Sequence, residues 1–249
     1  MSRLRSAVAS AWLLTLLLLL GLMSLSWNLL AAVLYPLLAR QRGLALGRRV
    51  ISRCYGGFWA FAELTGMIRI ESQAMDRFRD ESGLIIAANH PSMMDALILV
   101  ARLPRSACIM KADLMKNVFL GAGARLARYI CNDSPRSMIR LAVRDLQDGG
   151  QLVIFPEGTR TTQWPVNPFN SGVALIAKLA QVPIQAVFID SDSPYLGKGW
   201  PVWRLPPLPI VFRVRAGERF APSADPAALS RQIEQYFAAD AIARESAPC

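Results

Sequence analysis

An uncharged stretch near the amino terminus limits the possible folds of this chain more than any other feature. Residues 7–39 contain no Asp, Glu, Lys or Arg and are mostly Leu and Ala. A straight helix of that length would measure about 50 Å, well beyond the roughly 30 Å hydrocarbon core of a bilayer. We therefore expect the stretch to tilt, bend or turn back. One long helix and two shorter helices, divided near Ser24, Ser26, Asn28 or Pro36, both fit the sequence.

Charges on the two flanks indicate how this stretch meets a membrane. Arg3 and Arg5 precede it, and no acidic residue occurs before Glu63. The arginines that follow it are Arg40, Arg42, Arg48, Arg49 and Arg53. Arginine-rich flanks favour the cytoplasmic side, as expected of a hairpin that enters one leaflet of the inner membrane with the rest of the chain in the cytoplasm. A single span with its amino terminus outside gives the same placement, against the preference of Arg3 and Arg5.

The positive charge of the chain is concentrated beside this stretch. The net charge is +10, and the first 62 residues contain seven arginines and no acid. Residues 42–61 also carry Tyr55, Phe58, Trp59 and Phe61, so we expect them to lie in the membrane interface with their arginines among anionic headgroups. Residues 1–62 are thus interpreted as a membrane anchor and residues 63–249 as one further domain. A bilayer is the indicated partner, and no nucleic-acid recognition motif is present.

Residues 63–249 alternate between short apolar runs and helical segments. The expected strands are 84–88, 107–110, 151–155, 184–189 and 211–214, and the expected helices are 96–101, 135–148, 172–180 and 227–243. A Pro-rich segment, residues 194–209, is predicted to be a loop that touches the membrane or forms a wall of a binding groove. This alternation predicts an α/β fold with a single parallel or mixed sheet flanked by helices.

The only histidine, His90, begins a motif that ends at Asp95. Residues five apart do not share a helix face, so the two side chains can meet only if His90 lies outside the helix. Pro91 suits a first helical position, which makes His90 the expected cap residue and places Asp95 one turn further on. A carboxylate on the far nitrogen of an imidazole gives a general base with a fixed tautomer. The alternative is a hydrogen-bonded cap beside a first-turn carboxylate.

A second motif, residues 155–160, follows the expected strand 151–155. Pro156 and Gly158 force a tight turn at the carboxyl end of this strand, and ligands gather at such ends in open α/β sheets. We expect Glu157 and Arg160 to lie at the same edge as His90. The alternative is an exposed Glu157–Arg160 ion pair, which would stabilise the fold by only about 0 to 1 kcal/mol.

Together, the two motifs resemble the glycerophospholipid acyltransferases, in particular the lysophosphatidic acid acyltransferase group, over residues 83–189. The resemblance implies that His90 deprotonates an acceptor hydroxyl, which attacks an acyl thioester, and that Asp95 orients His90. It also implies an acyl-CoA or acyl-carrier-protein co-substrate and no further cofactor. By the same resemblance, the acceptor-binding residues are Lys111, Glu157, Gly158, Thr159 and Arg160.

Other parts of the chain depart from the family pattern. Val118 replaces a usual proline, and the arginine linked to the acceptor's phosphate is missing near Asn132. Phosphate recognition would then rest on Lys111 and Arg160, although Lys111 also reads as a solvated surface cation. The resemblance implies lysophosphatidic acid as the acceptor. Another lyso-lipid, such as lyso-ornithine lipid, or a non-catalytic lipid-binding protein with the same fold, are the alternatives.

Several other kinds of site find no support in the sequence. The four cysteines, at positions 54, 108, 131 and 249, form no CxxC pair, and one histidine cannot complete a set of soft metal ligands. We expect no metal site, and reduced thiols that are mostly structural. Neither a GxSxG elbow nor a GxxxxGK loop is present, which disfavours a serine hydrolase and an NTPase.

Overall fold

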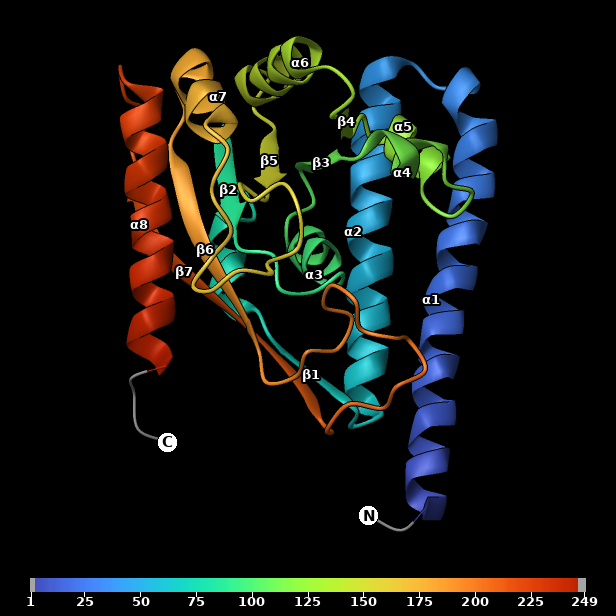
Figure 1. The fold of residues 1–249 in the computed structure, drawn as a ribbon. Helices are drawn as coiled ribbons and strands as arrows, with labels where there is room; N and C mark the ends of the chain where they lie inside the picture. Colours follow the sequence, from blue (N-terminus) through green and yellow to red (C-terminus); the bar gives the residue numbers. More distant parts are fainter. Residues whose placement is uncertain (1–2, 246–249) are drawn as a thin grey trace.

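A computed structural model describes residues 3–245 of the chain (Figure 1). Its centre is a seven-stranded sheet with the strand order β1-β7-β6-β2-β5-β3-β4. The strands are β1 (Ile68–Glu71), β2 (Leu84–Ala88), β3 (Ser106–Met110), β4 (Ile130–Cys131), β5 (Gln151–Ile154), β6 (Ile184–Ser191) and β7 (Ile210–Phe220). Neighbouring strands are parallel except for the antiparallel pair β6–β7. The predicted mixed sheet is confirmed, and it includes two short strands, β1 and β4, that the apolar pattern did not indicate.

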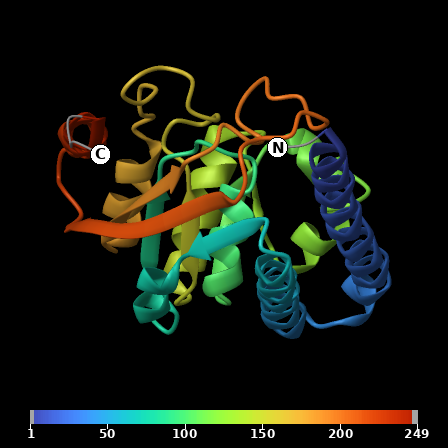
Figure 2. The same ribbon diagram turned by 90° about the horizontal axis from the view of Figure 1, so that it is seen from below.

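Helices cover both faces of this sheet (Figures 1 and 2). The helices are α1 (Arg3–Leu37), α2 (Arg40–Leu64), η1 (Gln73–Phe78), α3 (Asp95–Arg102), α4 (Ala112–Lys116), α5 (Gly121–Leu126), α6 (Pro135–Gln147), α7 (Gly172–Ala180) and α8 (Pro226–Glu245). In β2, Leu84 and Ile86 belong to the core shared with α2 and α3, whereas Ile85 and Ala87 belong to the core shared with α6, α7 and α8. Both faces of β2 are therefore buried, which explains its unbroken apolar sequence.

The uncharged stretch forms one long helix, α1, and the chain turns back at residues 38–39 into α2. Pro36 lies in the last turn, where the helix ends. Asn28 does not break α1, because its amide side chain leaves the helix and contacts the segment around α5. Its Oδ1 accepts a hydrogen bond from the amide of Gly123 (2.9 Å), and its Nδ2 donates to the carbonyl of Val118 (2.6 Å). Among the described residues, 6–37 form the one helix that is long and apolar enough to cross a membrane.

The expectation that the aromatic residues and arginines of α2 lie among lipid headgroups is wrong for several of them. Tyr55, Phe58 and Trp59 are buried in the core that α2 shares with the sheet. Arg48 is 4% exposed. Its guanidinium donates to the carbonyls of Ala127 and Arg105 and pairs with Asp145 at 2.7 Å. Side chains on this face of α2 therefore hold the helix to the domain, which the sequence pattern could not reveal.

Candidate active site

His90 and Asp95 lie in contact just beyond the carboxyl end of β2. His90 Nδ1 is 2.9 Å from Asp95 Oδ2, and the same oxygen accepts a hydrogen bond from the amide of Ser92 (2.8 Å). The predicted pairing is confirmed, but the predicted cap position of His90 is wrong, because α3 begins only at Asp95 and its cap residue is Met94. The hydroxyl of Ser92 donates to the carbonyl of Tyr195, and the amide of Met93 donates to the carbonyl of Leu196. These two bonds hold the intervening residues outside the helix.

The two side chains of this pair have very different environments. Asp95 is fully buried, and burial raises the pKa of its carboxyl to about 6, although the hydrogen bond and charge of His90 act in the opposite direction. The imidazole of His90 is 19% exposed and stacks on the ring of Phe155, with centroids 4.0 Å apart. No hydrogen bond to Nε2 of His90 is present within residues 3–245, so this nitrogen is free to accept a proton.

Glu157 points inward and joins the second motif to the first. Its Oε1 accepts hydrogen bonds from the amide of His90 (3.0 Å) and the hydroxyl of Thr161 (2.7 Å), and its Oε2 accepts one from the amide of Asn167 (3.1 Å). The amide of Thr161 in turn donates to the carbonyl of His90 (2.8 Å). Both backbone groups of His90 are thus fixed by the turn after β5. The alternative of an exposed Glu157–Arg160 ion pair is wrong, since Glu157 is 5% exposed and bonded elsewhere.

Arg160 contacts the loop that crosses the site. Its Nη1 donates to the carbonyls of Leu196 and Gly197, both at 3.0 Å, and the side chain is half-buried. Gly158 has a φ of +67°, and a Cβ there would lie 3.0 Å from Asn170 Nδ2, so glycine suits both the turn and its neighbour. The turn therefore fixes Arg160 between the His90 motif and the segment 194–209.

Sequence comparison places these motifs in a known family. A model of the family described as "Acyltransferase" matches residues 69–190. The chain is 30% identical over 138 residues to the 1-acyl-sn-glycerol-3-phosphate acyltransferases alpha of Mus musculus and Homo sapiens, which covers 53% of this chain and 48% and 49% of theirs. Residues 69–190 belong to the acyltransferase family. The chain spans about half the length of these mammalian relatives.

Two further similarities extend beyond the acyltransferase domain. A 1-acyl-sn-glycerol-3-phosphate acyltransferase of Pseudomonas aeruginosa is 25% identical over 194 residues, covering 74% of this chain and 72% of the relative. The crystal structure of the 1-acyl-sn-glycerophosphate (LPA) acyltransferase PlsC from Thermotoga maritima superposes with a TM-score of 0.71 at 21% identity, covering 100% of both chains. At this identity the structural likeness concerns the fold.

The other residues expected at this site make fewer contacts with the His90 motif. Lys111 follows β3 at the edge of the sheet where His90 lies, and its exposed side chain makes no hydrogen bond or ion pair with any described residue. Thr159 is half-buried next to Arg160. Val118 is 64% exposed in the connection between α4 and α5. The structure thus brings His90, Asp95 and the turn at Glu157 together and leaves Lys111 free in solvent.

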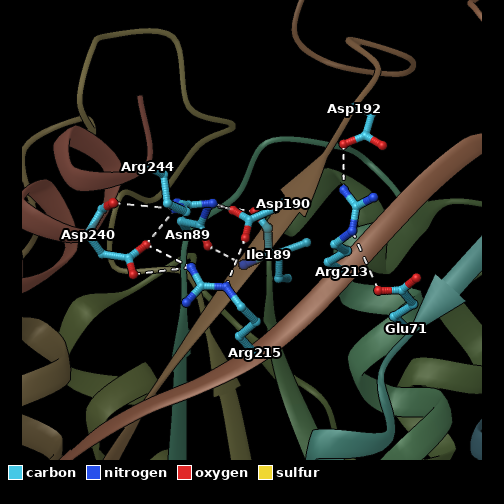
Figure 3. Close-up of polar contacts among 9 residues, drawn as sticks. All are labelled: Glu71, Asn89, Ile189, Asp190, Asp192, Arg213, Arg215, Asp240 and Arg244. Carbon is cyan, nitrogen blue, oxygen red and sulfur yellow. Dashed lines mark hydrogen bonds and ion pairs between the residues drawn. The ribbon is translucent and has the colours of Figure 1, made fainter. Parts of the chain in front are cut away.

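Asn89 is part of the site that the sequence motif contained without indicating its role. Its Nδ2 donates to the carbonyl of Ile189 (2.9 Å), and its Oδ1 accepts from the amide of the same residue (2.7 Å) (Figure 3). The next residue of β6, Asp190, pairs with Arg215 of β7 and Arg244 of α8, and both arginines pair with Asp240 of α8 (Figure 3). Asn89 therefore anchors the end of β2, next to His90, on β6.

A cavity of about 600 Å³ lies next to the His90 motif, although neither His90 nor Asp95 is among its lining residues. Its lining includes Asn89 and Pro91, which flank His90 in the chain, residues 161–166 after the second motif, and Asp190. The described residues contain no cluster of three or more His, Cys, Asp or Glu side chains that could hold a metal. Cysteines 54, 108 and 131 are free thiols, and Cys249 lies outside the described residues.

Proposed function

We propose that this protein is an O-acyltransferase that moves a fatty acyl group from an acyl thioester to the hydroxyl of a lysoglycerolipid, with lysophosphatidic acid giving phosphatidic acid. The observation that carries this proposal is the pairing of His90 Nδ1 with the buried carboxylate of Asp95, which leaves Nε2 unbonded. The names of the relatives support the same reaction.

The geometry supports a single displacement with His90 as general base. With Nδ1–H donated to Asp95, Nε2 carries the lone pair and takes the proton of the acceptor hydroxyl as its oxygen attacks the thioester carbonyl. The tetrahedral intermediate then collapses, the carbon–sulfur bond breaks, and the leaving thiolate takes the proton from His90. Asp95 stabilises the imidazolium between these steps. No bond between the acyl group and the protein is needed.

The acceptor's phosphate would be held by Arg160 and Lys111. Only Nη1 of Arg160 is used by the carbonyls of Leu196 and Gly197, so Nε and Nη2 remain able to donate to a phosphate. Lys111 adds a mobile point charge at the same edge. A phosphate-free lyso-lipid is the second candidate acceptor. It is motivated by the absence of an arginine near Asn132, between β4 and α6.

The packing of α1 supports a place for the acceptor at the bilayer surface. Leu13, Leu16 and Ala31 are buried against the domain, so one face of α1 packs along the protein over most of its length (Figure 1). Its other face exposes Val8, Leu18, Leu22, Leu29, Leu30, Val33 and Leu37. A helix with one face packed on a domain and the other face exposed and apolar lies in one leaflet more readily than it crosses both leaflets. The flanking arginines favour the cytoplasmic leaflet.

The loop over the site connects this helix to His90. Tyr195 and Leu196 share a core cluster with Leu13 and Leu16 of α1. The carbonyl of Leu196 also accepts bonds from the His90 motif and from Arg160. A lipid acceptor that leaves the bilayer along α1 would therefore arrive beside the two motifs.

Product analysis by mass spectrometry tests the proposal. The purified protein, in liposomes, receives lysophosphatidic acid with either acyl-CoA or acyl-carrier protein, and a panel of other lyso-lipids runs in parallel. We expect phosphatidic acid with the wild type and little with His90→Ala. Acylation confined to phosphate-free lyso-lipids would favour the second candidate, and no transfer with any acceptor would leave the non-catalytic alternative.

A further inference from the structure

A second cavity, of about 710 Å³, lies away from the His90 site. It opens between the end of α1, the first half of α2 and the end of α6. Arg105, which precedes β3, and Gly149 and Gly150, which precede β5, line it. These residues lie at the amino ends of the parallel strands, whereas His90 follows the carboxyl end of β2. The two cavities therefore belong to opposite edges of the sheet, and the second takes no part in the proposed acyl transfer.

This second cavity is strongly basic. Its lining contains two acids, Asp145 and Asp148, and the arginines Arg40, Arg48, Arg49, Arg105, Arg125, Arg128 and Arg144. One acid, Asp145, is already paired with the buried Arg48. The exposed side chains of Arg40, Arg49 and Arg144 have no hydrogen bond or ion pair within residues 3–245. The cavity thus holds several positive charges without a counter-charge, and focuses a field that attracts anions.

Arg128 also lines this cavity, and its backbone has an unusual conformation. Its φ is +56°, a region that non-glycine residues seldom adopt. Its guanidinium lies over the ring of Tyr35, 5.0 Å from the centroid, and Nη1 is 3.2 Å from the hydroxyl of Tyr35. Its Nε is buried and has no hydrogen-bond partner among the described residues. A buried charged donor without an acceptor is unfavourable, and an anionic oxygen in the cavity would supply the missing partner.

We propose that this cavity binds the phosphate group of an anionic membrane phospholipid. Guanidinium groups match phosphate oxygens with paired hydrogen bonds. Tyr35 places the cavity within the last turn of the apolar helix α1, next to the exposed Leu37. An aromatic side chain and arginines at the end of an apolar helix mark the level of lipid headgroups. A headgroup in the cavity would therefore leave its acyl chains beside the apolar face of α1 and fix the domain on an acidic bilayer.

Binding of short-chain lipids to the full chain, delipidated in an uncharged detergent, tests this site. The probes are dihexanoyl-phosphatidylglycerol, dihexanoyl-phosphatidylcholine and inorganic phosphate, with calorimetric titration as the readout. We expect the phosphatidylglycerol to bind, and Arg49→Ala with Arg144→Ala to weaken it by about tenfold or more. Both arginines are exposed and unbonded, so the double variant should unfold at the wild-type temperature without lipid.

The matched control is the double variant Arg136→Ala with Arg140→Ala. It removes two exposed arginines of α6, the helix that carries Arg144, and both lie outside the cavity. This control and His90→Ala should bind phosphatidylglycerol as the wild type does, which separates this site from the catalytic proposal. Equal affinity for phosphatidylcholine, or equal weakening in the control, would overturn the proposal. Inorganic phosphate binding as tightly as the lipid would also overturn it, since the site would then serve a soluble anion.

Discussion

The carboxylate of Glu157 accepts a hydrogen bond from the backbone amide of His90, 3.0 Å away and 67 residues earlier in the chain. Together with the bond from the amide of Thr161 to the carbonyl of His90, this contact fixes the histidine from the neighbouring strand. Glu157 is buried, so we expect it to act on the proposed reaction through the position of His90. The resemblance implied an acceptor-binding role for Glu157, whereas the geometry favours a positioning role.

Glu157→Gln tests this distinction. Glutamine has one acceptor oxygen where three donors converge, so one donor loses its partner and we expect a loss of about 1 to 3 kcal/mol in the free energy of unfolding. Displacement of His90 should lower kcat by about 10- to 100-fold with little change in the acceptor's KM. Steady-state kinetics and urea unfolding measure both, with the exposed Glu218→Gln as control. A raised KM at unchanged kcat would instead indicate contact with the acceptor.

His90→Ala should lower turnover by a factor of about 10² to 10⁴, the usual contribution of a positioned general base. The imidazole stacks on Phe155 and is 19% exposed, so its loss should leave the sheet intact. Circular dichroism checks the fold, and rates under saturating donor and acceptor check the chemistry. Transfer at the wild-type rate by a correctly folded variant would remove His90 from the mechanism.

The sheet could be predicted from the sequence because its central strands are buried on both faces. Leu84–Ala88 is an unbroken apolar run for that reason, and Ile184–Ser191 is apolar apart from Gln185 and its last two residues. Strand β4 has only two residues and β1 has four at the sheet edge, so neither gives a period that stands out. Their existence depends on the neighbours that they pair with, β3 and β7, and not on their own composition.

The pairing of His90 with Asp95 could be predicted from the sequence, but the contacts that hold the pair in place could not. The spacing of His90 and Asp95 required the histidine to lie outside a helix, and the two residues do meet. The start of α3 could not be read locally, because bonds to the segment at Tyr195 and Leu196 keep the intervening residues out of the helix. The partner of Arg160 is the same distant segment. Contacts between segments so far apart leave no periodic signal.

Arg48→Ala should destabilise the fold strongly, although Arg48 lies in a segment that the sequence pattern predicts to be in the membrane interface. It removes the partner of the largely buried Asp145, whose carboxyl pKa is already raised by burial, and leaves two backbone carbonyls without their donor. We expect a loss of about 3 to 5 kcal/mol in the free energy of unfolding. The neighbouring exposed Arg49→Ala should change it by less than about 0.5 kcal/mol. Chemical unfolding in detergent compares the two, and equal small effects would contradict the buried role.

Arg160→Ala should raise the KM for lysophosphatidic acid and loosen the loop 194–209. The variant loses the guanidinium available to a phosphate and both bonds to the carbonyls of Leu196 and Gly197. We expect a loss of about tenfold or more in kcat/KM for the phosphate-bearing acceptor, from a charge-assisted contact. Tryptophan fluorescence reports the loop separately in a background that keeps Trp200 and Trp203 and replaces the other four tryptophans by Phe. A changed fluorescence with unchanged kinetics would show that Arg160 only holds the loop and does not contact the acceptor.

Asp95→Asn should change the pH dependence of the free energy of unfolding and also lower turnover. Burial raises the pKa of Asp95 from 3.8 to about 6. The folded state therefore favours the protonated carboxyl, so the stability that Asp95 contributes is fully present below about pH 4 and is lost as pH rises through about 6. Asparagine does not titrate, so the variant's free energy of unfolding relative to the wild type should rise by roughly 3 kcal/mol between about pH 4 and pH 8. The asparagine amide of the variant should favour the His90 tautomer with the proton on Nε2, and so lower turnover by about 10² to 10⁴. In the wild type, turnover should fall as the pH drops below about 6, because the carboxylate of Asp95 becomes protonated. Urea unfolding across this pH range measures the difference, and a difference independent of pH would contradict the buried, titrating carboxylate.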